Sequence, residues 1–162
     1  MSPKSLLRHP KVHSTLEELT DGHFLEVIGD SSIKDPNTVE TVVLCSGKVY
    51  YELEEARDEK QSQRLAITRM EQLYPFPKSQ LAPFLNGYPK LKRVIWAQEE
   101  PKNMGAYYSV GHDIRRLLDD LGMQNVAMEY IGRSSKASPA TGSSAVHKKE
   151  QSAVIDGCME YA

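Results

Sequence analysis

The stretch TVETVVLCSG, residues 38–47, indicates the architecture of the domain. Its apolar run through Val42, Val43 and Leu44 is what a strand buried on both faces requires, because both sides of such a strand meet other side chains. The residues that follow, 48–64, have helical spacing instead. We therefore expect a central strand covered by helices on both faces.

The same alternation of an apolar run and a helical segment continues to the end of the sequence. Further strands are expected at 65–73, 91–100 and 125–132, and helices at 77–87, 105–122 and 143–161. Connections this short leave room only for crossover helices between parallel strands. The sequence therefore predicts an α/β fold with three layers, α/β/α, and a doubly wound, mostly parallel sheet.

The first residues differ from this pattern. We expect a lead-in segment over residues 1–22, with a short helix that begins at Ser2 and Pro3 and ends before Pro10. Residues 23–30 alternate in the manner of a strand. A sequence of 162 residues suits one core, so a single domain is expected over residues 23–162.

Composition excludes several classes of partner. The 20 basic and 22 acidic side chains leave a net charge of -2, which gives no overall field for nucleic acid or an anionic membrane. No apolar run approaches the ~20 residues of a membrane span. Cys45 and Cys158 match neither a disulfide framework nor a metal spacing. We expect reduced thiols and a location in a bacterial cytoplasm or a mitochondrial matrix.

The polar segment GRSSKASPATGSSAVHKKE, residues 132–150, leads into the last expected helix. Backbone N–H groups at the start of that helix favour an anion, and Arg133 and Lys136 precede it. A phosphate could bind there. The alternative is that the Ser and Thr residues only cap the helix while the basic side chains are solvated.

Two adjacent carboxylates, Glu99 and Glu100, stand where α/β enzymes keep site residues, at the end of a strand. Neighbours on a strand point to opposite faces, so we expect no shared proton and no catalytic pair. One of them is expected to meet a basic partner or a subunit interface. His9 and His13 are separated by Pro10 and have no third ligand, so no metal site is expected.

Five collinear stretches carry a resemblance to a known family. They are MSPKSLLRHP (1–10), VVLCSGKVYYEL (42–53), RMEQLYPFP (69–77), WAQEEPKNMGAYY (96–108) and KASPATGSSAVHKKEQ (136–151). Together they resemble the C-terminal domain of the thiamine-diphosphate-dependent first component of the 2-oxoglutarate dehydrogenase complex. The resemblance implies a transketolase C-terminal-like fold, which agrees with the three-layer fold expected above.

The resemblance also implies an activity for a longer protein. Members decarboxylate 2-oxoglutarate on thiamine diphosphate with Mg²⁺ and pass the succinyl group to the lipoyl group of the second component. The family's magnesium-diphosphate motif, Gly-Asp-Gly followed at a distance by paired Asn, is absent from this sequence. We therefore expect a domain that holds no cofactor, is inactive alone, and has as partners the remaining domains, the second component and a second copy in a homodimer.

In the family this domain carries a regulatory site for AMP or acetyl-CoA and helps to build the dimer. The resemblance places the nucleotide site at Arg133, Lys136, Ser138, Thr141 and Ser144. It places Glu99, Glu100, Asn103 and Gly105 on the edge that faces the dimer and the active site. The alternative is a free-standing module of the same fold that binds a nucleotide or an acyl-CoA. Such a module should bury its apolar surface, whereas a domain of a larger assembly should expose a patch.

Overall fold

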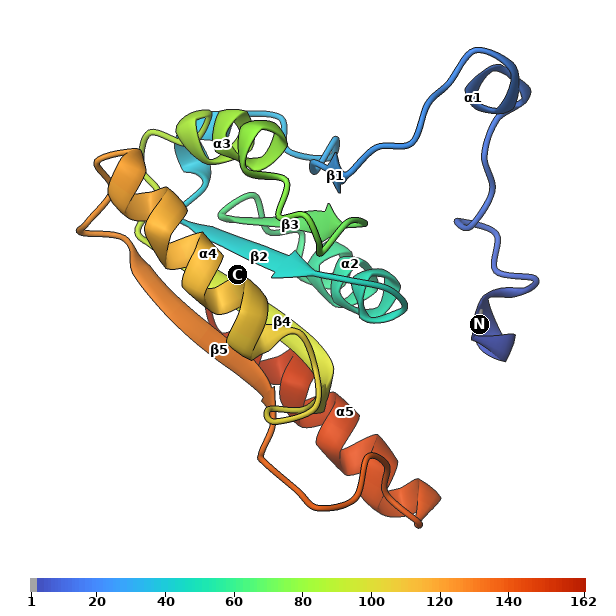
Figure 1. Cartoon of the computed structure of the whole chain (residues 1–162). Coiled ribbons are helices and arrows are strands. Elements are labelled where there is room, and N and C mark those ends of the chain that lie inside the picture. The colour runs from blue at the N-terminus through green and yellow to red at the C-terminus, as the bar shows by residue number, and fades with distance from the viewer. Residues whose placement is uncertain (1–2) are drawn as a thin grey trace.

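Five strands form one sheet in the order β1-β3-β2-β4-β5 in the computed structural model, which describes residues 3–162 (Figure 1). They are β1 (Val27–Ile28), β2 (Thr41–Cys45), β3 (Leu65–Met70), β4 (Arg93–Pro101) and β5 (Ala127–Arg133). Every neighbouring pair is parallel except β1 and β3. The expected mostly parallel sheet is confirmed, with one short antiparallel strand at its edge.

Helices cover both faces of this sheet (Figure 1). Two of them, α3 (Lys78–Asn86) and α4 (Tyr107–Asp120), pack on one face, and α2 (Val49–Lys60) and α5 (Ser144–Met159) pack on the other. Side chains of β2 alternate between the two cores: Leu44 packs with the first pair of helices and Val43 with the second. The predicted three-layer, doubly wound fold is confirmed.

The strand that decided the prediction lies at the centre of the sheet. All five residues of β2 are buried, and Val43 pairs with Ile67 on one side and Ile95 on the other. The polypeptide runs from β2 to β3 in one direction and then to β4 and β5 in the other. The carboxyl ends of β2 and β4 therefore form the topological switch point, where α/β folds bind their ligands.

The residues before the sheet extend away from it (Figure 1). They contain η1 (Lys4–Leu6) and α1 (Leu16–Thr20), and η2 (Pro36–Thr38) precedes β2. Thr15 and Glu18 cap α1 reciprocally, which explains a helix of one turn. Ser2 lies outside the described residues, so its expected capping role is untested. Leu16, Leu19 and Phe24 are exposed along this segment.

The strand expected at residues 23–30 is shorter than the sequence predicts. In the continued register Asp30 would face Ile67, but its carboxylate accepts the Ile67 N–H at 2.8 Å. The same carboxylate pairs with Arg57 of α2, and both side chains are almost fully buried. A side chain thus replaces the backbone at this edge of β3, and the ion pair ties the edge to α2.

Both thiols lie in the core between the sheet and the helices α2 and α5, and they are free. Burial raises the pKa of Cys158 to about 12 and also raises the pKa of Cys45. Both are therefore held as packed, unreactive thiols. No helix within residues 3–162 is long and apolar enough to cross a membrane.

Candidate functional site

Arg133 ends β5 and turns its side chain inward, toward α5. It is 8% exposed, and its Nη2 lies 3.0 Å from His147 Nδ1 and 3.1 Å from Gln151 Oε1. Arg133, which the sequence predicts to bind a phosphate, is thus a buried cation with partners on the following helix, α5. A bound anion would have to approach the guanidinium alongside these partners.

Glu150 of α5 connects the two predicted cations. Its Oε1 accepts a hydrogen bond from the Lys136 ammonium, and its Oε2 lies 3.5 Å from Arg133 Nε. The hydrogen bond from Lys136 holds the pKa of the Glu150 carboxyl below its ordinary value. Two cations around one carboxylate leave an excess positive charge, which suits an anion.

Several polar atoms around this cluster have unused hydrogen-bonding capacity. Five buried side-chain atoms of the described residues have no hydrogen-bond partner. Two of them, Arg133 Nε and Glu150 Oε2, belong to this cluster and lie 3.5 Å apart, and a third, Thr141 Oγ1, belongs to the loop that leads to α5. Buried polar groups are normally paired. Phosphate oxygens could accept from Arg133 and Thr141, and a ribose hydroxyl could donate to Glu150.

The other two residues predicted to bind the nucleotide, Ser138 and Ser144, are exposed. The Ser138 hydroxyl donates to the Ala140 carbonyl at 2.7 Å, and Ser144, the first residue of α5, is exposed. Within residues 3–162 no hydrogen bond joins either serine to Arg133 or Lys136. The N-cap residue Ser143 makes no side-chain capping bond, so simple capping does not account for the hydroxyl-rich sequence.

Asn103 joins the loop after β5 to the loop after β4. Its Nδ2 donates to the Lys136 carbonyl, and its Oδ1 accepts the Lys136 N–H, both at 3.0 Å. The resemblance placed these two residues in separate groups, one at the interface and one at the nucleotide site. The structure brings them into direct contact.

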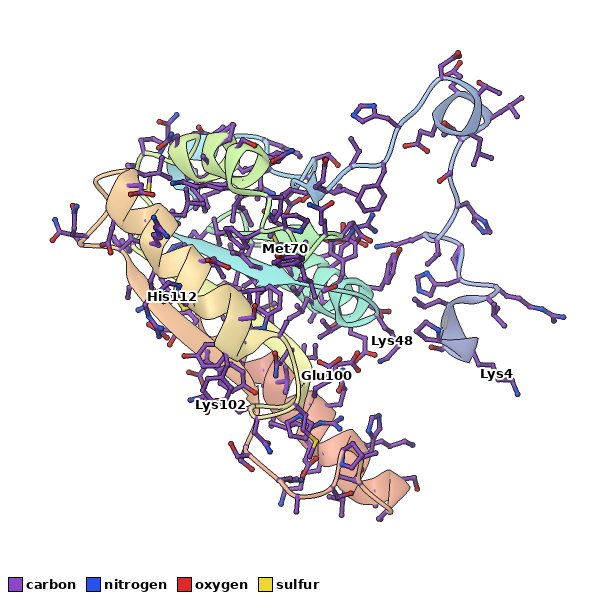
Figure 2. All side chains as sticks on the ribbon, in the orientation of Figure 1. Lys4, Lys48, Met70, Glu100, Lys102 and His112 are labelled. Atoms are coloured by element: carbon purple, nitrogen blue, oxygen red, sulfur yellow. The ribbon has the colours of Figure 1, made fainter. Side chains whose placement is uncertain are left out.

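The two strand-end glutamates have different surroundings. Glu99 pairs with Lys48 at 3.0 Å. Glu100, which is labelled with Lys48 in Figure 2, is exposed. Burial of Lys48 opposes its charge, but hydrogen bonds to Glu52 and Glu99 outweigh burial and raise its pKa. The expectation that one glutamate has a basic partner is confirmed.

A buried amide shapes the turn after β4. Gln98 is 4% exposed, and its Oε1 accepts from Trp96 Nε1 at 2.8 Å and from the Tyr107 N–H at 3.1 Å. A methyl group at Gly105 would overlap the Gln98 amide, so a larger residue there would force Gln98 to move. A hollow of about 520 Å³ lies over this turn at the switch point, between Lys48, Glu99 and Gly105.

Sequence reasoning did not propose Gln98, Glu150 or Gln151 as site residues. Gln151 lies on the same buried face of α5 as Val154 and Cys158. A polar residue at this spacing on an otherwise apolar face is the one feature of the sequence that could have indicated its role. Among residues 3–162 no three His, Cys, Asp or Glu side chains are placed to hold a metal ion.

The sequence is similar to known proteins along almost its full length. The family model 2-oxoglutarate dehydrogenase C-terminal matches residues 13–159. The 2-oxoglutarate dehydrogenase E1 component of Azotobacter vinelandii is 43% identical over 155 residues, 96% of this chain and 16% of that protein.

Two further relatives carry the same printed name. The protein of Haemophilus influenzae is 42% identical over 161 residues, 99% of this chain and 17% of that protein. That of a Geobacillus species is 44% identical over 157 residues, 96% of this chain and 16% of that protein. The chain thus spans about a sixth of the length of these curated relatives.

Proposed function

Because the chain belongs to the 2-oxoglutarate dehydrogenase C-terminal family, we propose that it serves as the C-terminal domain of a 2-oxoglutarate dehydrogenase E1 component. In this proposal the whole protein decarboxylates 2-oxoglutarate with thiamine diphosphate and Mg²⁺ and transfers the succinyl group to the lipoyl group of the second component. It acts in the bacterial cytoplasm or the mitochondrial matrix, where its two free thiols stay reduced.

The residues of this chain do not fit the cofactor. Glu99, the half-buried carboxylate at the end of β4, is already paired with Lys48, and residues 3–162 contain no cluster of metal-binding side chains. We therefore assign the cofactor to other parts of the protein. We expect the chain by itself not to decarboxylate 2-oxoglutarate.

We assign a regulatory role to the site between β5 and α5. The excess positive charge around Glu150 carries this assignment, because a phosphate would share Arg133 and Lys136 with that carboxylate. The unpartnered Thr141 hydroxyl and the start of α5 add donors. The ligand class is a phosphate-bearing nucleotide, AMP or acetyl-CoA.

We also propose that the domain pairs in a homodimer. Exposed apolar side chains include Leu7, Leu16, Leu19, Phe24, Leu25, Tyr74, Met104 and Tyr108. This amount of exposed apolar surface supports a domain that packs against partners more than a free-standing nucleotide or acyl-CoA module. Sedimentation of the purified chain at rising concentration tests this, and a monomer throughout would count against self-association.

Calorimetric titration with AMP and with acetyl-CoA tests the regulatory site. We expect saturable binding of at least one ligand and a loss of about tenfold in affinity, ~1.4 kcal/mol, for Lys136→Met. Lys149→Met is the matched control, because Lys149 is an exposed lysine on α5 for which the structure gives no ion pair within residues 3–162. Equal affinities of the two variants would remove Lys136 from the site.

A further inference from the structure

A continuous series of polar contacts runs from the loop after β5 to the end of β4. We call it the polar relay. In order, its members are Lys136, Glu150, Arg133, Gln151, Glu52, Lys48 and Glu99. Positive and negative charges alternate along it, with one neutral amide in the middle. The relay thus joins the candidate nucleotide site to the hollow at the switch point.

The half of the relay on α5 consists of ion pairs around Glu150. Glu150 contacts Lys136 and Arg133, and Arg133 Nη2 then donates to Gln151 Oε1 at 3.1 Å. Arg133 is 7% exposed along its side chain, so water screens these contacts weakly. A change in the charge around Glu150 therefore changes the electrostatic energy of the Arg133 guanidinium.

The half of the relay on α2 reaches the hollow. Gln151 Nε2 donates to Glu52 Oε2 at 2.8 Å, and Glu52 Oε1 accepts from Lys48. Lys48 Nζ also lies 3.0 Å from Glu99 Oε1. The Lys48 ammonium pairs with both carboxylates, so a movement of Glu52 changes the ion pair between Lys48 and Glu99.

Gln151 is the connection between the halves. Gln151 is 7% exposed, and the two ends of its amide are not interchangeable, because the oxygen faces a guanidinium and the NH₂ faces a carboxylate. Turning the amide over would set its NH₂ donor against the Arg133 guanidinium, itself a donor, and its acceptor oxygen against the Glu52 carboxylate, itself an acceptor. The orientation of Gln151 therefore depends on the charges on both sides.

We propose that Gln151 is a positioning residue that couples the loop after β5 to the Lys48–Glu99 pair at the hollow. An anion that takes Lys136 or Arg133 from Glu150 changes the bond between Arg133 and Gln151. The hydrogen bond from Gln151 to Glu52 then changes, and the Lys48 ammonium moves toward either Glu52 or Glu99. This goes beyond the nucleotide site, because it assigns a route by which the state of the loop reaches the switch point.

Contact along a path does not by itself establish coupling, so the test perturbs one end and observes the other. Lys136→Met removes the cation at the loop end, and the backbone amide resonances of Lys48 and Glu99 are followed in spectra of the ¹⁵N-labelled chain. Lys149→Met removes the same charge from exposed α5 and controls for long-range electrostatics. We expect the Lys48 and Glu99 amides to move in the first variant and to stay in place in the second.

The second arm cuts the relay in the middle. Gln151→Met removes both amide contacts at similar volume, and Gln151→Glu keeps the shape but sets a carboxylate against Glu52. In either background Lys136→Met should no longer move the Lys48 and Glu99 amides. Dispersed spectra establish that each variant is folded, and the isosteric Gln151→Glu serves if Gln151→Met does not fold.

Two results would overturn the proposal. The first is that the Lys48 and Glu99 amide resonances do not move in Lys136→Met. The second is that Lys136→Met moves them equally in the parent chain and in the Gln151 variants. Neither arm uses a ligand. A chain that binds neither AMP nor acetyl-CoA would thus refute the nucleotide site and leave the relay to be judged by its own result.

Discussion

The side-chain amide of Asn103 forms two hydrogen bonds with the backbone of Lys136, one in each direction, both at 3.0 Å. Asn103 follows β4 and Lys136 follows β5, so these bonds fasten two loops at the carboxyl end of the sheet. They fix the backbone of a residue that we assign to the nucleotide site. The position of the Lys136 side chain therefore depends on a residue from another loop.

Asn103→Ala should loosen the loop after β5. Loss of two exposed hydrogen bonds is expected to cost about 1–2 kcal/mol of the free energy of unfolding and to speed hydrogen exchange at residues 134–142. Asn125→Ala is a matched control, because Asn125 is exposed and the structure gives it no side-chain hydrogen bond within residues 3–162. Unchanged exchange in Asn103→Ala would mean that the loop is held by other contacts.

Gly105→Ala should disturb the turn after β4. The added methyl group overlaps the Gln98 amide, and the forced movement is expected to cost about 1–3 kcal/mol. Gln98 accepts the indole N–H of Trp96, the one tryptophan of the sequence, so Trp96 fluorescence should change as well. Gly142→Ala, where a methyl group meets open space, should leave stability and fluorescence unaltered.

Much of the fold could be predicted because its apolar pattern is local. Each parallel strand is indicated by an apolar run, the first through Val42, Val43 and Leu44 and the others at 65–73, 91–100 and 125–132. The short connections indicate the crossover helices. Strand β1 was harder to predict. Its length depends on Asp30, whose carboxylate takes a backbone N–H from a strand 37 residues away in sequence.

The candidate site was predictable only in part. Composition indicated Arg133 and Lys136, because basic residues beside a helix start suit an anion. The role of Gln151 depends on contacts with β5 and α2, which no local pattern encodes. Sequence spacing placed Gln151 on the buried face of α5, but it could not show that a guanidinium and a carboxylate lie on either side.

The Asp30–Arg57 ion pair should dominate the stability of the sheet edge. Asp30→Asn removes the buried counter-ion of a guanidinium that is 3% exposed and leaves it only the half-exposed Asp58, so a cost of about 3–5 kcal/mol is expected in chemical denaturation. Asp120→Asn is the control, because the Lys78–Asp120 pair is about half exposed. It should have an effect within the error of the measurement. Equal effects of the two variants would contradict the structural role of the buried pair.

Glu40 should make stability depend on acid. Hydrogen bonds from Arg64 and Lys92 lower its pKa from 4.5 to about 2. Because the folded-state pKa is lowered, the stabilisation is present above pH 4.5 and is lost as the pH falls toward 2. Unfolding of Glu40→Gln, measured across this range, should show a weaker dependence on pH than the parent. An unaltered slope would show that other carboxylates carry the acid sensitivity.

The proposed nucleotide site between β5 and α5 is tested most directly by recording the amide spectrum of the ¹⁵N-labelled chain during titration with AMP and with acetyl-CoA. We expect at least one ligand to shift the resonances of residues 133–150 saturably, with the largest changes around Arg133, Lys136 and Thr141. Saturable shifts at another surface, or no shifts with either ligand, would contradict the assignment of a nucleotide site between β5 and α5.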